Sequence, residues 1–142
     1  MFIIIMGCGR VGARLASQMS RAGHEVTILD INRRAFGRLE ENFAGTTIVG
    51  NGIDVDVLRR AGIERADAFA AATQGDNRNI MASQVARHIF KVPKVVSRIY
   101  DPLRQETFEM LGIDSISPTV IGTNAFLQLL DPPKTEAAGD GS

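Results

Sequence analysis

The chain has 142 residues, which is enough for one domain with a hydrophobic core. Its 16 basic residues balance 16 acidic ones, which argues against a strong electrostatic field for nucleic acid or an anionic lipid surface. The single cysteine cannot form an internal disulfide, and no apolar run has the length of a signal-peptide core or a membrane span. We therefore expect a cytoplasmic protein without nucleic-acid partners or direct membrane insertion.

An Ile-rich strand is expected over residues 2–6, and a glycine-rich turn follows it. The turn reads Gly7-Cys8-Gly9-Arg10-Val11-Gly12, which matches the Gly-x-Gly-x-x-Gly pattern of dinucleotide-binding sites. In that pattern the first glycine makes the turn, the second admits a ligand, and the third packs a helix against the strand. The free amides and positive dipole of that helix favour a pyrophosphate. An empty scaffold of the same fold is the alternative.

The helix after this turn is expected to end at Gly23. Val11, Leu15 and Met19 recur at a spacing of four residues, with Ala16 and Ala22 alongside, so we expect this stripe to face the sheet. A second buried strand follows over residues 26–29.

Asp30 ends the second strand, about 20 positions beyond the glycines. Nucleotide sites of this kind hold a carboxylate there, which accepts hydrogen bonds from ribose hydroxyls. The same carboxylate would repel a 2′-phosphate, so NAD is favoured over NADP despite Arg33 and Arg34 nearby. We count Ile31 and Arg34 among the candidate binding residues.

The next segment is expected to be a helix with Asn32 as its N-cap. Phe36, Leu39 and Phe43 would form its apolar stripe, and Arg38 with its charged neighbours would mostly face water.

The third strand, residues 46–49, leads into a polar turn that contains Asn51 and Gly52. Open α/β sheets bind ligands at the carboxyl ends of their strands, and the Asn51 amide could both donate to and accept from an adenine edge. The alternative is ordinary turn chemistry, since both residues tolerate positive φ. Both interpretations stay open, and Asp54 is expected to cap a short helix after the turn.

The fourth strand, residues 68–72, ends in another polar loop that includes Thr73. Asn79 is expected to begin or cap the helix that follows. The fifth strand covers residues 94–99, and Arg98 near its end could reach a phosphate across the cleft. A surface ion pair is the alternative for this arginine.

Pro102 is expected to begin a helix that carries Leu103 and Phe108 on its apolar side, before a sixth strand over residues 115–117. Pro118 opens a last helix that is apolar around much of its circumference. This helix either packs into its own domain or buries one side against a partner subunit. The alternation of strands and helices predicts an α/β fold, a Rossmann-type doubly wound parallel six-stranded sheet with helices on both faces.

Several short motifs follow one another in order: Gly7-Cys8-Gly9-Arg10-Val11-Gly12, Leu29-Asp30, Val49-Gly50-Asn51-Gly52, residues 58–63, residues 71–79, Ser97-Arg98-Ile99-Tyr100 and residues 111–118. In this order and spacing, residues 1 to about 130 resemble the nucleotide-binding half of the potassium-conductance regulators, known as RCK, KTN or TrkA-N domains. No single motif is diagnostic, and the combination carries the resemblance.

The resemblance implies a cytoplasmic regulatory subunit or domain of a potassium channel or transporter, held at the inner face of the membrane by that partner. It implies binding of NAD(H) or an adenine nucleotide (ATP, ADP or AMP) and a change of shape with the ligand. In the family, the glycine loop holds phosphates, the arginine matching Arg10 reaches phosphate, and the acid matching Asp30 holds the ribose. The residue matching Asn51 is commonly Asp and contacts the adenine, and Arg98 matches a basic residue facing the cleft.

The resemblance also matches the last helix to a crossover helix that family members exchange between paired subunits, which implies a homodimer or higher homo-oligomer. We therefore divide the chain into a nucleotide-binding domain (residues 1–117), a crossover or dimerisation helix (118–130) and a flexible tail (131–142).

A cofactor-binding domain of a NAD-dependent oxidoreductase is the alternative function. Hydride transfer needs a substrate pocket and a proton donor over the nicotinamide, and only Tyr100 or His88 could supply the proton. We favour a regulator with no catalytic residue and no metal site. Redox sensing by Cys8 is a third hypothesis, because a helix N-terminus beside Arg10 would lower the thiol pKa. The favoured alternative is that Cys8 is simply a small residue in the glycine loop.

Overall fold

A computed structural model describes residues 1–134 of the chain. Six parallel strands form one sheet in the order β3-β2-β1-β4-β5-β6, which confirms the expected Rossmann-type fold. The strands are β1 (Phe2–Met6), β2 (Glu25–Asp30), β3 (Thr46–Val49), β4 (Ala68–Ala71), β5 (Lys94–Arg98) and β6 (Asp114–Ile116).

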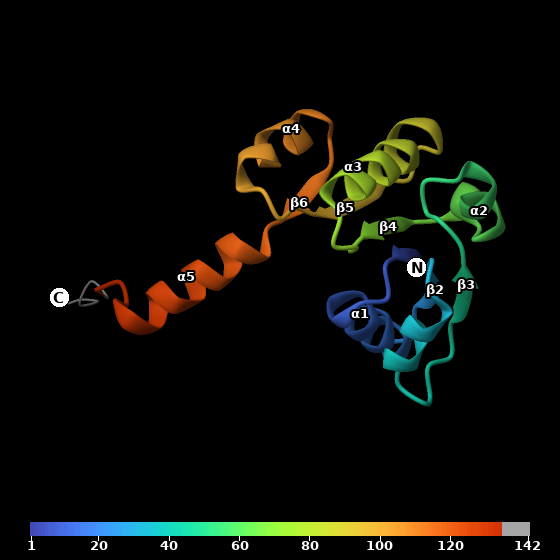
Figure 1. Cartoon of the computed structure of the whole chain (residues 1–142), viewed down its shortest axis with the longest axis horizontal. Helices are drawn as coiled ribbons and strands as arrows, with labels where there is room; N and C mark the ends of the chain where they lie inside the picture. Colours follow the sequence, from blue (N-terminus) through green and yellow to red (C-terminus); the bar gives the residue numbers. More distant parts are fainter. Residues whose placement is uncertain (135–142) are drawn as a thin grey trace.

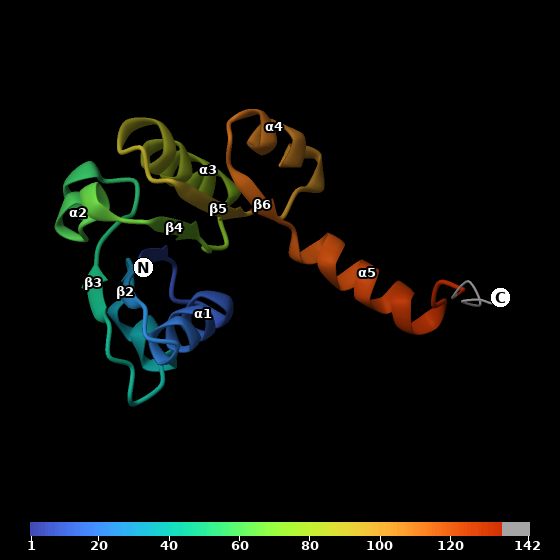
Figure 2. The ribbon, with the colours of Figure 1, turned by 180° about the vertical axis from the view of Figure 1, so that it is seen from behind.

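The helices cover the two faces of this sheet unequally (Figures 1 and 2). One face carries α1 (Arg10–Arg21) and the 3-10 helix η1 (Arg33–Arg38), both next to β1, β2 and β3. The opposite face carries α2 (Val55–Arg60), α3 (Asp76–Gln84) and α4 (Gln105–Met110). Three short helical segments complete the fold: η2 (Ile63–Arg65), the π-helix η3 (Val85–Ile89) and η4 (Pro102–Arg104).

Strand β1 is the centre of the domain, since all five of its residues are buried. Its even-numbered residues Phe2, Ile4 and Met6 join the core cluster under α2, α3 and α4. Ile3 and Ile5 join the smaller cluster under α1 and η1. A continuous apolar run suits a central parallel strand because both of its faces are covered.

The face that α1 turns to the sheet differs from the predicted one. Val11 is 52% exposed and Leu15 is 37% exposed, so the predicted stripe points mostly to solvent, with Met19 half-buried. The buried residues of α1 are all small: Gly12, Ala13, Ala16 and Ser17. Of the predicted stripe, Ala16 is therefore buried as expected, and Ala22 is exposed. The third glycine of the loop brings this helix so close to the sheet that large side chains do not fit between them.

The helix after β2 is shorter than predicted. Asn32 does cap it, because its Oδ1 accepts a hydrogen bond from the Arg34 N–H at 3.0 Å. The helix that it caps is the 3-10 helix η1, which ends at Arg38 instead of running to Phe43. Phe36, Leu39 and Phe43 are half-buried against the smaller core cluster, in agreement with their apolar pattern.

Two predictions in the second half of the sheet are wrong. Asn79 does not begin or cap its helix, because α3 starts at Asp76 after the N-cap Gly75 and Asn79 is fully buried inside it. Leu103 is 88% exposed, whereas Phe108 is fully buried as expected.

Helix α5 (Pro118–Leu130) projects away from the sheet and the other helices (Figures 1 and 2). None of its residues is buried, so it does not pack into its own domain. Its most exposed large apolar side chains are Phe126, Leu129 and Leu130. Within residues 1–134, none of the helices is long and apolar enough to cross a membrane. Residues 135–142 of the expected tail lie outside the described residues.

Candidate functional site

A cavity of about 730 Å³ opens at the carboxyl end of the sheet. The chain builds β1, β2 and β3 to one side and then returns to build β4, β5 and β6 on the other, so the strand order reverses between β1 and β4. Parallel α/β sheets bind ligands at such a reversal point. The lining residues are Met6, Gly7, Cys8, Gly9, Arg10, Val11, Leu29, Asp30, Ile31, Asn32, Ala35, Arg38, Gly50, Asn51, Gly52, Ala72, Thr73, Gln74, Arg78 and Arg98.

The glycine loop forms the floor of the cavity, and its three glycines meet different constraints. Gly7 has φ +106°, and a Cβ there would lie 2.9 Å from the backbone nitrogen of Thr73. A Cβ on Gly12 would collide with the carbonyl oxygen of Gly7, so α1 packs directly on the loop. Gly9 caps α1, and a Cβ there would meet no atom within 4 Å. Nothing within the domain therefore requires glycine at position 9.

The Asp30 carboxylate holds the loop and lines the cavity at the same time. Its Oδ2 accepts a hydrogen bond from the Cys8 N–H at 2.8 Å, and its Oδ1 accepts one from the Asn32 N–H at 2.8 Å. A carboxylate has about four acceptor positions, so this half-buried group keeps the capacity to accept two more hydrogen bonds.

The Cys8 thiol is fully buried and its Sγ lies 3.3 Å from the carbonyl oxygen of Ala35, to which it donates. Burial, and after it the charge of Asp30, raise the pKa of this thiol from 9.0 to about 11, against a smaller lowering by the charge of Arg38. The expected lowering by the helix terminus and Arg10 is therefore wrong, because desolvation dominates. A buried, protonated thiol is a poor redox sensor.

The turn after β3 is held by its own asparagine. Asn51 Oδ1 accepts a hydrogen bond from the Ile53 N–H at 3.2 Å, which favours the turn interpretation for this oxygen. Asn51 itself is exposed and lines the cavity. Neither Asn51 nor Gly52 has a positive φ. Gly52 is instead required by close approach, because a Cβ there would collide with the Met6 side chain.

Asn79 joins the loops that follow β4 and β5. Its Oδ1 accepts hydrogen bonds from the N–H and hydroxyl of Thr73, at 3.1 and 2.6 Å. Its amide nitrogen donates to the carbonyl oxygens of Thr73 and Arg98, both at 3.0 Å. Asn79 does not line the cavity, so it positions Thr73 and Arg98 from behind.

The charged lining of the cavity is strongly basic although the whole chain has no net charge. Four arginines contribute to it, and Asp30 is the only acidic residue among its lining. Arg38 is exposed, as expected, and it also lines the cavity, where its guanidinium donates a hydrogen bond to the Cys8 carbonyl oxygen at 3.3 Å. Arg78 was not among the predicted residues either. A basic concave surface of this kind attracts phosphate groups.

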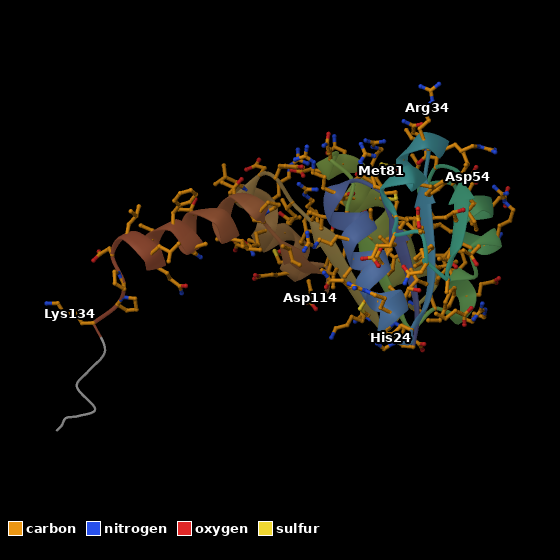
Figure 3. The ribbon with its side chains drawn as sticks, turned by 90° about the horizontal axis from the view of Figure 1, so that it is seen from below. His24, Arg34, Asp54, Met81, Asp114 and Lys134 are labelled. Carbon is orange, nitrogen blue, oxygen red and sulfur yellow. The ribbon has the colours of Figure 1, made fainter. Side chains whose placement is uncertain are left out.

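Eleven of the 14 residues predicted for the site line this cavity. The exceptions are Gly12, which packs against the loop from below, the buried Asn79, and Arg34. Arg34 is exposed and points away from the domain at the carboxyl end of the sheet, opposite His24 and Asp114 (Figure 3). Within residues 1–134, no group of three or more His, Cys, Asp or Glu side chains is arranged to hold a metal ion.

Comparison with known proteins gives a consistent result. Residues 3–118 match the sequence model of the TrkA-N domain. The Trk system potassium uptake protein TrkA of Streptomyces coelicolor is 46% identical over 136 residues, which cover 96% of this chain. The chain spans 61% of the length of that relative.

Two solved structures share the fold at lower identity. The GsuK channel bound to NAD superposes with a TM-score of 0.78 at 24% identity, over 92% of this chain and 23% of the channel chain. The Kef C-terminal domain of Shewanella denitrificans in its AMP-bound form gives a TM-score of 0.78 at 21% identity, over 92% of this chain and 82% of that domain.

Proposed function

Because this chain belongs to the TrkA-N domain family, we propose that it is a regulatory domain that binds an adenine nucleotide and controls a potassium transport system at the membrane. The observation that carries the proposal is the basic cavity at the reversal point of the sheet, with the glycine loop as its floor. The family consists of regulatory domains rather than enzymes, which disfavours the oxidoreductase alternative.

The ligand would lie across the carboxyl ends of β1, β2 and β4. Its phosphates would contact the amides of the glycine loop and the positive end of α1, with Arg10 at the rim. Asp30 would accept hydrogen bonds from the ribose hydroxyls, using the acceptor positions that the backbone leaves free. The adenine would lie toward Asn51, whose amino group would donate to the ring.

The comparison structures support this class of ligand, since one was solved with NAD and the other with AMP. The name of the Streptomyces relative supports a potassium uptake system as the partner. The domain would then act at the inner face of the membrane through a membrane subunit.

A second copy of the chain would cover the exposed surface of α5 and an open part of the sheet. Ala70, Val96 and Ile116 lie on the α1 side of β4, β5 and β6, whereas α2, α3 and α4 cover the other face. Val96 is half-buried and Ile116 is 46% exposed. Exchange of α5 between two copies would bury apolar surface on both partners, in line with the family resemblance.

The test is calorimetric titration of the whole chain with AMP, ADP, ATP, NAD and NADH. Asp30→Ala should weaken every ligand that carries a ribose, whereas Asp114→Asn, an exposed acid at the opposite end of the sheet, should leave all affinities unchanged (Figure 3). No measurable binding of any of the five ligands to the wild-type chain would refute the proposed function.

A further inference from the structure

We propose that a group of basic side chains at the amino end of the sheet docks the domain onto an anionic bilayer surface. The basic cluster consists of cationic side chains and the apolar ones between them: Arg59, Arg87, His88, Ile89, Phe90, Lys91 and Lys94. None of these residues lines the nucleotide cavity, so the inference does not depend on which ligand the cavity binds. It goes beyond the proposed function by giving the domain a membrane contact of its own.

The topology places the basic cluster at the end of the sheet opposite the nucleotide cavity. Lys94 is the first residue of β5, and the strands are all parallel, so it lies at the same end as His24 and Asp114 (Figure 3). The π-helix η3 ends near this edge, at Ile89, because the helix between two parallel strands runs back to the end at which the next strand begins.

Contacts join the segments of the basic cluster into one surface. The guanidinium carbon of Arg59 lies 5.6 Å from the centroid of the Phe90 ring, which ties the end of α2 to the residue after η3. Figures 1 and 2 show the end of the helix that continues α3 beside α2. Arg87 donates hydrogen bonds to the carbonyl oxygens of Val92 and Pro93, both at 3.4 Å, and so holds η3 to the start of β5.

The cations of the basic cluster have few acidic neighbours, although the whole chain has no net charge. Residues 77–100 contain no Asp or Glu. On neighbouring elements, Glu25 pairs with Arg65 at 2.8 Å, and the Asp67 carboxylate accepts a backbone hydrogen bond at 2.7 Å from the start of β1. Glu64 is exposed. Within residues 1–134, none of the salt bridges includes a residue of the basic cluster, so its cations are available to an anionic partner.

Lys91 has a backbone conformation that does not suit lysine. Its φ of +56° is the only positive φ of a non-glycine residue within residues 1–134. The turn after a helix commonly takes glycine in this conformation, and the chain places Gly23, Gly62 and Gly112 with positive φ after α1, α2 and α4. The backbone therefore does not account for a lysine at position 91, whereas contact between its exposed charge and an anionic surface does.

The apolar side chains favour a bilayer over other anionic partners. Ile89 is 61% exposed and follows the exposed His88, with Lys91 two residues later. Apolar side chains among cations are typical of surfaces that lie on anionic membranes, where the cations meet headgroups and the apolar groups enter the interface. An acidic peptide is usually bound in a groove. The basic cluster lines neither the nucleotide cavity nor the cleft of about 290 Å³ at the start of α3.

Docking through the basic cluster would turn the nucleotide cavity away from the membrane. The cluster lies at the amino end of the parallel strands, and the cavity opens at their carboxyl end. A nucleotide could therefore enter and leave the cavity while the domain stays on the bilayer.

The experiment is co-sedimentation of the whole chain with vesicles of phosphatidylcholine, alone or mixed with an equal amount of phosphatidylglycerol. The chain should bind only the mixed vesicles, and less strongly at high salt. Lys94→Gln should lose about fivefold in vesicle affinity, and Ile89→Ser should also lose affinity. Arg34→Gln and Leu103→Ser are the matched controls, because both residues are exposed and follow the carboxyl ends of strands (Figure 3).

Lys91→Gly separates docking from folding. Glycine adopts a positive φ without strain, so the urea midpoint of this variant should not fall below that of the wild-type chain. Its affinity for the mixed vesicles should fall about fivefold, because one cation is lost from the surface. Calorimetric titration with ADP should give the wild-type affinity, since Lys91 lies outside the cavity.

Failure of the wild-type chain to bind the mixed vesicles would overturn the docking surface, and so would equal binding to both kinds of vesicle. Unchanged vesicle affinity in Lys91→Gly and Lys94→Gln, or an equal loss in Arg34→Gln, would overturn it as well. Binding to polyglutamate without binding to vesicles would assign the basic cluster to an acidic protein partner instead. In each case nucleotide titration still decides the proposed function separately.

Discussion

The glycine loop allows stability and ligand binding to be separated with two substitutions of the same kind. Gly12→Ala places a Cβ against the carbonyl oxygen of Gly7. The Cβ is fixed by the backbone of α1 and the oxygen belongs to the backbone of the loop, so neither atom can rotate away. To relieve this clash, the variant must either shift α1 away from the sheet or distort the loop. Overpacking of a well-packed interior costs about 1–3 kcal/mol and occasionally more. Because this clash is with backbone, we expect a loss of about 3 kcal/mol or more in the free energy of unfolding.

Gly9→Ala should behave differently. Gly9 has φ −79° and ψ −164°, which alanine adopts without strain, and its Cβ would meet no atom within 4 Å. Alanine is a weaker N-cap than glycine by roughly 0.5–1 kcal/mol. It also restricts the unfolded chain, which stabilises by about 0.4–1 kcal/mol. These effects have opposite signs and similar sizes, so the net change in stability should be close to zero.

The new methyl group at position 9 would nevertheless stand where the pyrophosphate approaches the loop. Urea unfolding and calorimetric titration with ADP should therefore give opposite patterns: Gly12→Ala loses stability, whereas Gly9→Ala keeps stability and loses at least tenfold in affinity. Wild-type affinity in a stable Gly9→Ala variant would refute the placement of phosphate on the loop. Wild-type stability in Gly12→Ala would refute the packing argument.

Three further outcomes are expected. The Asn79 side chain is hydrogen-bonded to Thr73 and to the carbonyl oxygen of Arg98, and Asn79→Ala removes all of these bonds. Urea unfolding should therefore show a loss of about 2–4 kcal/mol in the free energy of unfolding. The pKa of Cys8 is raised from 9.0 to about 11 in the folded chain. Between these values the unfolded chain releases a proton that the folded chain keeps, so stability should fall as the pH rises from 9 to 11. The urea midpoint of Cys8→Ser, which cannot titrate there, should fall less over that range. Finally, a chain that stops before residues 118–130 should keep its cooperative unfolding and become a monomer by light scattering, because α5 buries nothing in its own domain; a truncated chain that remains dimeric would contradict exchange of α5.

The order of the strands was predictable because local and global features agree in the first half of the chain. A buried strand, a Gly-x-Gly-x-x-Gly turn and an acid at the end of the next strand together specify one arrangement. The same features correctly indicated that Asp30 and the loop share a cavity. They did so because parallel strands place all their carboxyl ends at one edge of the sheet.

The errors have different physical causes, and the first is that periodicity records hydrophobicity and not the distance between elements. Val11 and Leu15 form the more apolar stripe of α1, yet Gly12 brings the helix too close to the sheet for large side chains. Arg38 is exposed, as its charge indicates, but the pattern did not show that it also lines the cavity and donates to the Cys8 carbonyl oxygen. Asn79 was read as a cap, since asparagine is common there, and only the fold places it between two loops.

A regulatory domain must transmit ligand binding to the surface that meets its partners, and the sheet offers a short route. Arg98 pairs in register with Ile116, and the Ile99 N–H donates to the Ile116 carbonyl oxygen at 2.9 Å. Helix α5 begins two residues later, at Pro118. A phosphate bound to the Arg98 side chain would therefore act on the strand pair from which α5 leaves the domain. Asp30 lies on the other side of β1, at the end of β2, so a ligand contact there would not act directly on that strand pair.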